Sequence, residues 1–195
     1  SFLAYLQGDY DELAEQAQRS LDLATSVGGI ALQAEGLRNL GIAAYRTGNY
    51  ERAIELYERS LAASRSIDDR ASVAKCHNNI GFALRTMGRY EEAVASFQRA
   101  LDLHQATGSM EGAAGVLANI GGVYLRSGDL PRSLETLEQA IGRSEACHAD
   151  WVTAKATRTL GSVYSRMGQW EDARRTAQKA RKLAESLGSK EDLGA

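Results

Sequence analysis

Two rows of polar side chains recur along this 195-residue chain and could bind a carboxylate and a peptide backbone. Both rows follow one period of 40 residues, and they comprise Asn39, Asn79, Asn119, Arg46, Arg126 and Arg166. A guanidinium group can hold a carboxylate through two parallel hydrogen bonds, and an amide side chain can both donate to and accept from a peptide backbone. The same residues also have plainer explanations. The arginines could pair with nearby carboxylates on a solvated helix face, and the asparagines could bond within their own repeat or across to the next.

Cysteine and histidine stand side by side twice, at Cys76-His77 and Cys147-His148. The two pairs are 71 residues apart, which is not a multiple of the 40-residue period, so they occupy non-equivalent positions. We predict a buried thiol beside a partly exposed histidine. The cysteine spacing matches no metal or redox motif, and no phosphate-binding loop, dinucleotide fingerprint, zinc-protease motif or nucleophile elbow is present. We therefore expect no catalytic residue, no cofactor and no metal, and we predict that the protein is not an enzyme.

A recurring glycine indicates the helices that hold the asparagine and arginine rows at a fixed spacing. One glycine per period lies inside an otherwise helical pattern, at Gly41, Gly81, Gly121 and Gly161. Glycine within a helix costs about 1 kcal/mol relative to alanine, so a cost repeated at one site implies a repeated packing gain. Twelve residues after each glycine stands a small residue: Ala53, Ala93, Ser133 and Ala173. We predict that these small residues face the glycines across two closely packed helices.

Each 40-residue unit is predicted to contain two helices, at residues 30–47 and 50–66 in the second unit. Asp9, Asn49 and Asp129 stand where N-caps are needed before the second helices, and Pro131, the one proline, falls in a first helical turn where proline is tolerated. Turns between units are predicted at residues 28–29, 68–69, 108–109, 149–150 and 188–189. We expect a single array over 1–195, with a truncated unit 1–28, full units 29–68, 69–108, 109–148 and 149–188, and the start of a further unit at 189–195.

The third unit carries a family resemblance. Its Asn79-Ile80-Gly81, the stretch GRYEEA from Gly88 to Ala93, and the later Phe97 closely resemble a tetratricopeptide repeat. The common repeat has about 34 residues and ends with a proline. The 40-residue period without that proline looks like the long-repeat subclass of spindle-orientation adaptors and of sensor regions in bacterial regulators. The resemblance implies an all-α, right-handed α-α superhelix (a solenoid) of tandem helix–turn–helix repeats, with about ten helices.

In this family the first helix of each pair lines a concave groove. Carried over residue by residue, the resemblance assigns the peptide-binding groove to Arg38, Asn39, Ile42, Tyr45, Arg46, Lys75, Asn78, Asn79, Phe82, Arg85, Asn119, Arg126, Lys155, Arg158 and Arg166, with Phe2, Tyr5 and Leu6 from the truncated unit. Glu35 is a further groove candidate of the second unit. Eight of the candidates are basic and only Glu35 is acidic, although the whole chain has a net charge of −2. Ile42 and Gly115 stand where a chaperone-binding carboxylate clamp needs Asn and Lys, so binding of chaperone tails is not predicted.

These residues predict a protein- or peptide-binding scaffold whose basic groove holds an acidic or carboxylate-bearing segment. The arginines would select acidic groups, the asparagines would bind backbone, and Ile42, Tyr45 and Phe82 would take an apolar anchor. We place Trp170 in the core, and Trp151 either in the core or at a contact. The scaffold would be the sensor or docking region of a larger bacterial regulatory or signalling protein.

Two alternatives come from other classes of protein. Open ends exposing Phe2, Leu3 and Leu6 could drive self-association, and the basic groove could bind nucleic acid, although the acidic remainder of the chain argues against the latter. Two thiols in a chain of this size suggest a reducing compartment, most simply the cytoplasm. No apolar run approaches the roughly 20 residues that span a bilayer, so no membrane partner is expected. The strong preference for Arg over Lys indicates a high-GC bacterial genome.

Overall fold

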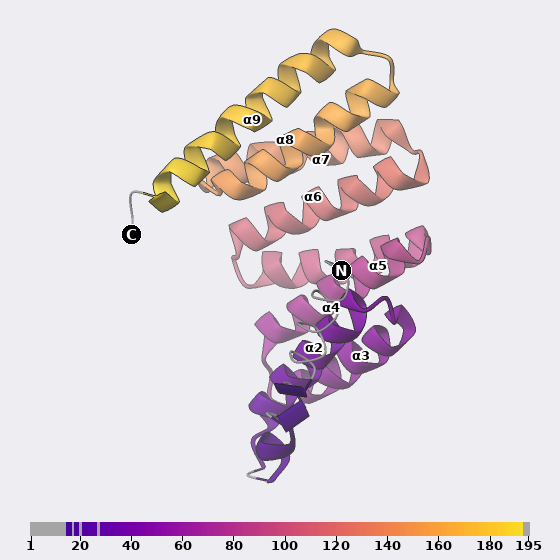
Figure 1. The fold of residues 1–195 in the computed structure, drawn as a ribbon, viewed down its shortest axis with the longest axis vertical. Coiled ribbons are helices and arrows are strands. Elements are labelled where there is room, and N and C mark those ends of the chain that lie inside the picture. Colours follow the sequence, from indigo (N-terminus) through magenta and orange to yellow (C-terminus); the bar gives the residue numbers. More distant parts are fainter. Residues whose placement is uncertain (1–14, 17, 20, 27, 193–195) are drawn as a thin grey trace, which may run out of the picture. The chain divides into compact units, whose positions relative to one another are not determined.

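The computed structural model describes residues 15, 16, 18, 19, 21–26 and 28–192, and all regular structure in these ranges is helical (Figure 1). After helical residues between 15 and 26 come α2 (Ile30–Arg46), α3 (Tyr50–Ser66), α4 (Arg70–Thr86), α5 (Tyr90–Ala106), α6 (Met110–Ser127), α7 (Leu130–Ala146), α8 (Asp150–Arg166) and α9 (Trp170–Asp192). The all-α fold is confirmed, and the predicted helices at 30–47 and 50–66 match α2 and α3 to within one residue. Phe2, Leu3, Tyr5, Leu6 and the predicted cap Asp9 lie outside the described residues.

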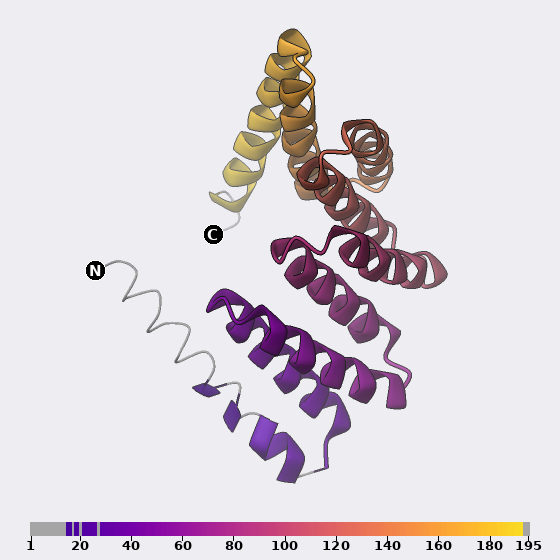
Figure 2. The ribbon, with the colours of Figure 1, turned by 90° about the vertical axis from the view of Figure 1, so that its right-hand side faces the viewer.

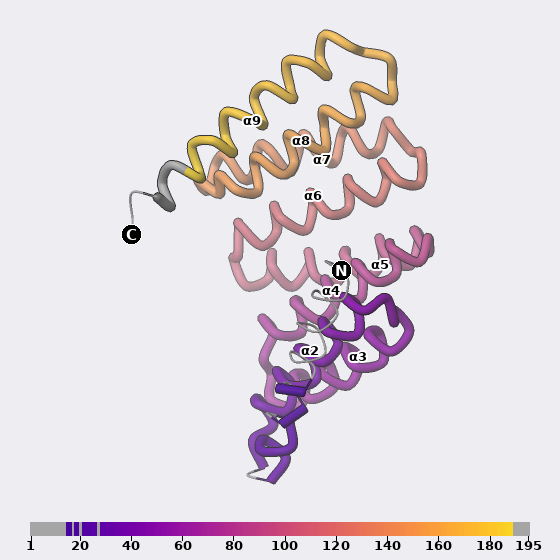
Figure 3. The backbone as a smooth tube through the Cα atoms, viewed as in Figure 1, coloured from indigo at the N-terminus to yellow at the C-terminus, as the bar shows by residue number. Residues whose placement is uncertain are grey.

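From here on, the word unit denotes one of two larger compact parts of the chain, each of which contains more than one 40-residue repeat. The first unit ends at Leu103 and the second unit begins at His104. In the first unit α2 packs against α3 and α3 against α4. In the second unit α6 packs against α7, α7 against α8, and α8 against α9 (Figure 2). Packing between neighbours in sequence is the pattern of a solenoid, in which each repeat buries its apolar face against the next. The tube in Figure 3 shows the two helices of a pair, such as α8 and α9, running antiparallel through a short turn.

Short turns are possible because each contains a residue in the left-handed region. Six of these residues are glycines, which adopt positive φ without steric cost: Gly28, Gly48, Gly88, Gly108, Gly128 and Gly168. Asp68 (φ 52°) and His148 (φ 56°) take the same conformation although each carries a Cβ. An L-residue there costs about 1–2 kcal/mol relative to a right-handed conformation.

Side chains cap the second helices as predicted. The Asn49 side chain accepts a hydrogen bond from the Arg52 backbone N–H at 3.3 Å, and Asp129 accepts one from the Arg132 N–H at 3.1 Å. Pro131 occupies the first turn of α7. These caps fix where α3 and α7 begin, and the side chains that follow are thereby held in register.

The repeated glycines admit large side chains from the paired helix. A Cβ added at Gly41 would lie 2.5 Å from Cε1 of Tyr57, and one added at Gly81 would lie 2.8 Å from Cε1 of Phe97. In the second unit, a Cβ at Gly121 would lie 2.6 Å from Cγ of Leu137. Tyr57, Phe97 and Leu137 are buried at equivalent positions of α3, α5 and α7.

The prediction that the helices approach closely is therefore right, but the side chain that fills the space differs from the one predicted. The side chain that fills the space belongs to the residue four positions after the small residue, for example Phe97 after Ala93, because this residue points directly at the glycine. The small residue also lies close, since Ser133 Oγ donates to the Gly121 carbonyl at 2.8 Å. The fourth pair departs from the pattern: the atoms nearest a Cβ at Gly161 lie 3.7 Å away, and Ala177 stands where the others have Tyr, Phe or Leu.

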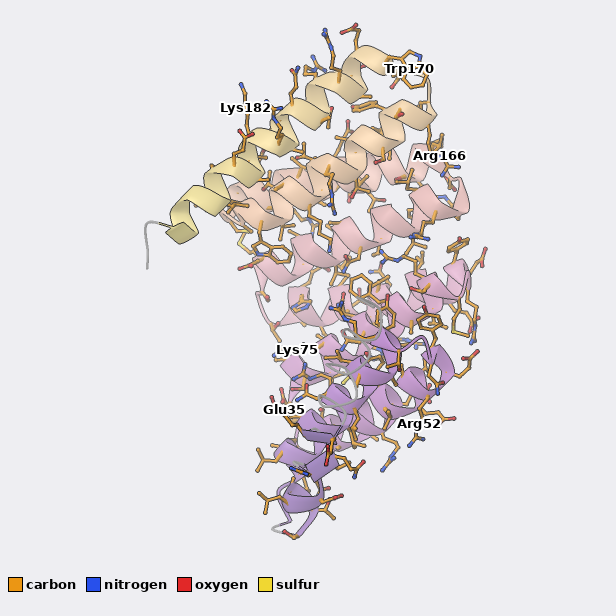
Figure 4. All side chains as sticks on the ribbon, viewed as in Figure 1. Glu35, Arg52, Lys75, Arg166, Trp170 and Lys182 are labelled. Carbon is orange, nitrogen blue, oxygen red and sulfur yellow. The ribbon has the colours of Figure 1, made fainter. Side chains whose placement is uncertain are left out.

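Two further expectations for the last repeat were wrong. Trp170, predicted to lie in the core, begins α9 with 68% of its surface exposed (Figure 4). Its position precedes the buried stripe of the helix, so the indole projects to solvent. The turn predicted at residues 188–189 is absent, and α9 continues through them to Asp192. The glycine signal failed there because an isolated glycine lowers helix propensity without ending a helix.

Candidate binding faces

The predicted groove residues fall on the first helices of the pairs, in two sets. The α2–α4 face, in the first unit, comprises Arg38, Asn39, Ile42, Tyr45, Arg46, Lys75, Asn78, Asn79, Phe82 and Arg85. The α6–α8 face, in the second unit, comprises Asn119, Arg126, Lys155, Arg158 and Arg166. Figure 4 marks Lys75 on α4, Arg166 on α8, and Glu35, the acidic residue among the predicted groove positions.

Aromatic side chains organise the α2–α4 face. Tyr45 Oη and Thr86 Oγ1 lie 3.1 Å apart, and this hydrogen bond joins the end of α2 to the end of α4. The Phe82 ring meets the buried Phe97 ring edge-on, with centroids 5.3 Å apart. The Arg85 guanidinium lies 4.9 Å from the Phe82 centroid. Phe82 is thus held from both sides and still partly exposed, which suits an apolar contact of fixed position.

Polar groups on the same face are open to a ligand. Asn39 and Asn79 occupy equivalent positions of α2 and α4, are partly exposed, and make no side-chain hydrogen bond to the residues that the structure describes. The exposed Arg46 and Lys75 likewise have no hydrogen bond or ion pair within that range. Arg38 lies 3.6 Å from Glu35, so its charge is already partly balanced. The face therefore combines two amides that lack a hydrogen bond to the described residues with two exposed cations, of which Lys75 also helps to lower the pKa of the Asp69 carboxyl.

The α6–α8 face is bonded differently. Asn119 is only 5% exposed, and its Oδ1 accepts a hydrogen bond from Lys155 Nζ at 2.7 Å. At Asn119 the asparagine row therefore agrees with the alternative interpretation, in which an asparagine bonds across to the next repeat. Here the bond runs from α6 to α8. Arg166 Nη1 donates to the backbone carbonyl of Leu125. Arg126 and Arg158 are exposed and make no hydrogen bond or ion pair to any described residue.

A tryptophan that the sequence left undecided belongs to the α6–α8 face. The Trp151 indole is 50% exposed, and its Nε1 donates to Glu111 Oε1 at 2.5 Å. Lys155 Nζ lies 6.0 Å from the ring centroid. Trp151 and Glu111 are 40 residues apart, so they occupy equivalent positions of neighbouring repeats. This spacing of one repeat is the sequence signal that could have predicted their contact. Trp151 is therefore a surface aromatic held in one orientation.

Arginines on or just before the second helices contrast with those on the first helices. Those near the start of α3, α5, α7 and α9 each pair with a carboxylate three residues away: Arg52 with Glu55, Arg89 with Glu92, Arg132 with Asp129, Arg174 with Glu171 and Arg175 with Asp172. Such exposed pairs contribute little stability, but they neutralise the surface locally. On the first helices, the exposed Arg46, Arg126 and Arg158 have no such carboxylate partner among the described residues.

The Cys-His neighbours show no catalytic arrangement. Cys76 is fully buried, its Sγ donates to Ser60 Oγ at 3.3 Å, and burial raises the pKa of its thiol, so the nucleophilic thiolate is disfavoured. His77 is also buried, which corrects the prediction of a partly exposed histidine. Burial first, and then the charges of Arg65 and Arg99, lower the pKa of His77 to about 4. Within the described ranges, no three His, Cys, Asp or Glu side chains are grouped to hold a metal ion.

Antiparallel helix pairs that repeat at a 40-residue period define a helical-repeat scaffold. The family model for the tetratricopeptide repeat matches residues 1–66, 32–106 and 112–186. The chain belongs to the tetratricopeptide repeat family. No helix in the described part of the chain has the length and apolarity needed to cross a membrane. No curated protein sequence matches the chain.

Solved structures share this fold at low sequence identity. BtubC (BKLC) from P. vanneervenii is 18% identical with a TM-score of 0.71, and the match covers 96% of this chain and 93% of that one. A Rap protein complexed with Competence and Sporulation Factor is 15% identical with a TM-score of 0.80, covering 94% and 52%. The Rap conjugation gene regulator of plasmid pLS20, in complex with the Phr* peptide, is 19% identical with a TM-score of 0.78, covering 94% and 51%. This chain thus spans about half the length of those two Rap proteins.

Proposed function

We propose that the chain captures an acidic or carboxylate-bearing peptide segment on the α2–α4 face, as the sensor or docking region of a larger bacterial regulatory or signalling protein. One observation carries the proposal: Asn39 and Asn79, one repeat apart, present amides with no hydrogen bond to the described residues, beside the open cations of Arg46 and Lys75. Amides spaced by one repeat can bind successive backbone groups of an extended segment. The open cations select carboxylates.

Other features support this assignment. Phe82 offers an apolar contact held between Phe97 and Arg85, which lowers the entropy lost on binding. Two of the solved structures with this fold, the Rap proteins, were determined with Competence and Sporulation Factor and with the Phr* peptide. Tetratricopeptide arrays typically bind rather than catalyse, in keeping with the expectation of a non-enzyme.

The test uses a displayed library of short linear peptides, panned against the intact chain. Enriched peptides should be rich in Asp and Glu, and their affinity, measured by fluorescence anisotropy, should fall as salt rises. Replacing Arg46→Glu together with Lys75→Glu should weaken binding at least tenfold, about 1.4 kcal/mol. Replacing Asn39→Ala with Asn79→Ala should weaken it without changing the preference for acidic peptides, because backbone contacts carry no sequence information.

The matched control places the same charge changes on second helices. Arg59 and Arg99 are exposed on α3 and α5 without a hydrogen bond or ion pair to the described residues, so Arg59→Glu with Arg99→Glu should leave affinity unchanged. Equal losses from both double variants would show that only net charge matters and would overturn the proposal. Enrichment of peptides without carboxylates, or tighter capture of RNA than of any peptide, would also overturn it.

A further inference from the structure

The last helix pair, α8 and α9, borders an open cavity of about 870 Å³. Its floor consists of small residues, among them Gly161 from α8 and Ala173, Ala177 and Ala180 from α9. Ala177 is exposed, so the floor is reachable from solvent. The three alanines lie on one side of α9, because positions four and seven residues apart share a helix face. Another helix could therefore approach both backbones closely.

Inside the cavity, the last pair lacks a large side chain that the other pairs possess. Ala177 is equivalent to Tyr57, Phe97 and Leu137, each of which is buried against the glycine of its paired helix. Gly161 has no such neighbour, since nothing lies closer than 3.7 Å to a Cβ placed there. The notch between Gly161 and Ala177 is thus the size of an aromatic or Leu side chain, and nothing in the described part of the chain fills it.

Charge at this cavity also departs from the pattern of the other repeats. Five cations border it and no carboxylate does: Lys155, Arg158, Arg166, Arg174 and Arg181. Arg181 is equivalent to Leu61 and Leu101, which are buried, and Arg174 to the apolar Ile54 and Val94. Stacking an apolar repeat face here would bury Arg158 without a partner and would remove water from the exposed ion pairs of Arg174 and Arg181, at a large desolvation cost. An occupant of this cavity must therefore bring carboxylates.

The cations at the cavity can exchange partners. Arg158 has no hydrogen bond or ion pair to any described residue. Arg174 pairs with Glu171 at 2.9 Å and Arg181 with Glu185 at 3.3 Å, and both pairs are solvent-exposed. Pairs of this kind are weak, so a ligand carboxylate in the less hydrated cavity can replace them.

We propose that the α8–α9 cavity binds an acidic amphipathic helix of a partner protein. The helix inserts one large apolar side chain into the notch between Gly161 and Ala177, as Phe97 does against Gly81 within the chain. Its flanking Asp and Glu side chains pair with Arg158, Arg174 and Arg181. The site shares Lys155, Arg158 and Arg166 with the α6–α8 face, but it contains no residue of the α2–α4 face, and so it is a second binding site beyond the proposed peptide face.

The probe is a fluorescein-labelled helical peptide of about five turns, or ~18 residues, with Leu along one face and Glu elsewhere, compared with a twin in which every Glu is Lys. The Glu peptide should bind the intact chain and the Lys peptide should not. Ala177→Leu reproduces the Leu137 arrangement, fills the notch from within, and should weaken binding at least tenfold while raising the unfolding midpoint. Arg174→Glu with Arg181→Glu should weaken it by a similar factor.

The control lies on a neighbouring but separate surface of the same helix. Arg175 and Lys182 border a separate surface of α9, so Arg175→Glu with Lys182→Glu makes the same charge change away from the cavity and should leave binding intact (Figure 4 labels Lys182). Arg46→Glu with Lys75→Glu should also leave it intact, which separates this site from the α2–α4 face. Unchanged affinity in Ala177→Leu, equal binding of both peptides, or equal losses from the control would overturn the proposal. Concentration-dependent dimerisation of the chain that blocks the peptide would assign the cavity to a second copy and would overturn it too.

Discussion

Alanine substitution at two equivalent glycines should have opposite effects on stability. Gly81 and Gly161 occupy the same position in two repeats, and both lie inside a 17-residue helix, so Gly→Ala gains about 1 kcal/mol of helix propensity at each. At Gly161 the added Cβ meets its nearest atoms at 3.7 Å, which is ordinary contact. At Gly81 it meets Cε1, Cδ1 and Cζ of the buried Phe97 at 2.8–2.9 Å. Overpacking of this kind costs about 1–3 kcal/mol.

Because helix propensity cancels between the two sites, Gly81→Ala should be less stable than Gly161→Ala by the overpacking cost, about 1–3 kcal/mol. Gly161→Ala should itself be more stable than the parent chain. Urea unfolding followed by helical circular dichroism gives the free energies, and for a chain of this length the midpoint temperature moves by about 2–4 °C per kcal/mol.

The same Gly161→Ala substitution, made in the Ala177→Leu variant, tests directly whether overpacking by a large facing side chain causes the difference. In Ala177→Leu, a large side chain faces Gly161 as Leu137 faces Gly121, where an added Cβ would lie 2.6 Å from Cγ. Gly161→Ala should then turn from stabilising to destabilising. The reasoning is refuted if Gly81→Ala and Gly161→Ala change stability equally in the parent chain, or if Ala177→Leu leaves the effect of Gly161→Ala unchanged.

Three further predictions follow from backbone conformation, titration and burial. His148→Gly should stabilise the chain by about 1 kcal/mol in urea unfolding, because the left-handed φ of 56° strains a residue with a Cβ. The pKa of His77 is depressed from 6.5 to about 4 in the folded state, so its neutral form contributes stability that is complete above about pH 6.5 and is lost as the pH falls through 4. His77→Leu should flatten that part of the stability–pH profile, and an unchanged slope would contradict the assignment. A thiol reagent should label the partly exposed Cys147 well before the fully buried Cys76, as mass spectrometry of the digested chain can show.

Interactions between residues close in sequence, which sequence patterns can predict, determined most of the fold. The 40-residue period set the order of the helices in the described ranges, the caps at Asn49 and Asp129 set where α3 and α7 begin, and glycines marked most turns. These signals are reliable because each acts within a few residues of its own position. The tetratricopeptide resemblance then predicted the candidate site on the first helices, where Asn39 and Asn79 make no side-chain hydrogen bond to the described residues.

Tertiary packing decided what local patterns cannot encode, namely which side chain meets which across a repeat. A buried Phe97 and not the small Ala93 fills the space at Gly81, and Asn119 bonds to Lys155 while Asn39 and Asn79 stay open. Equivalent positions in the sequence thus acquire different environments, because a solenoid gives each residue neighbours from an adjacent unit whose side chains differ. The cavity at α8 and α9 depends on the same fact: the alanine at position 177 is unremarkable in sequence, and only its packing opposite Gly161 leaves a notch.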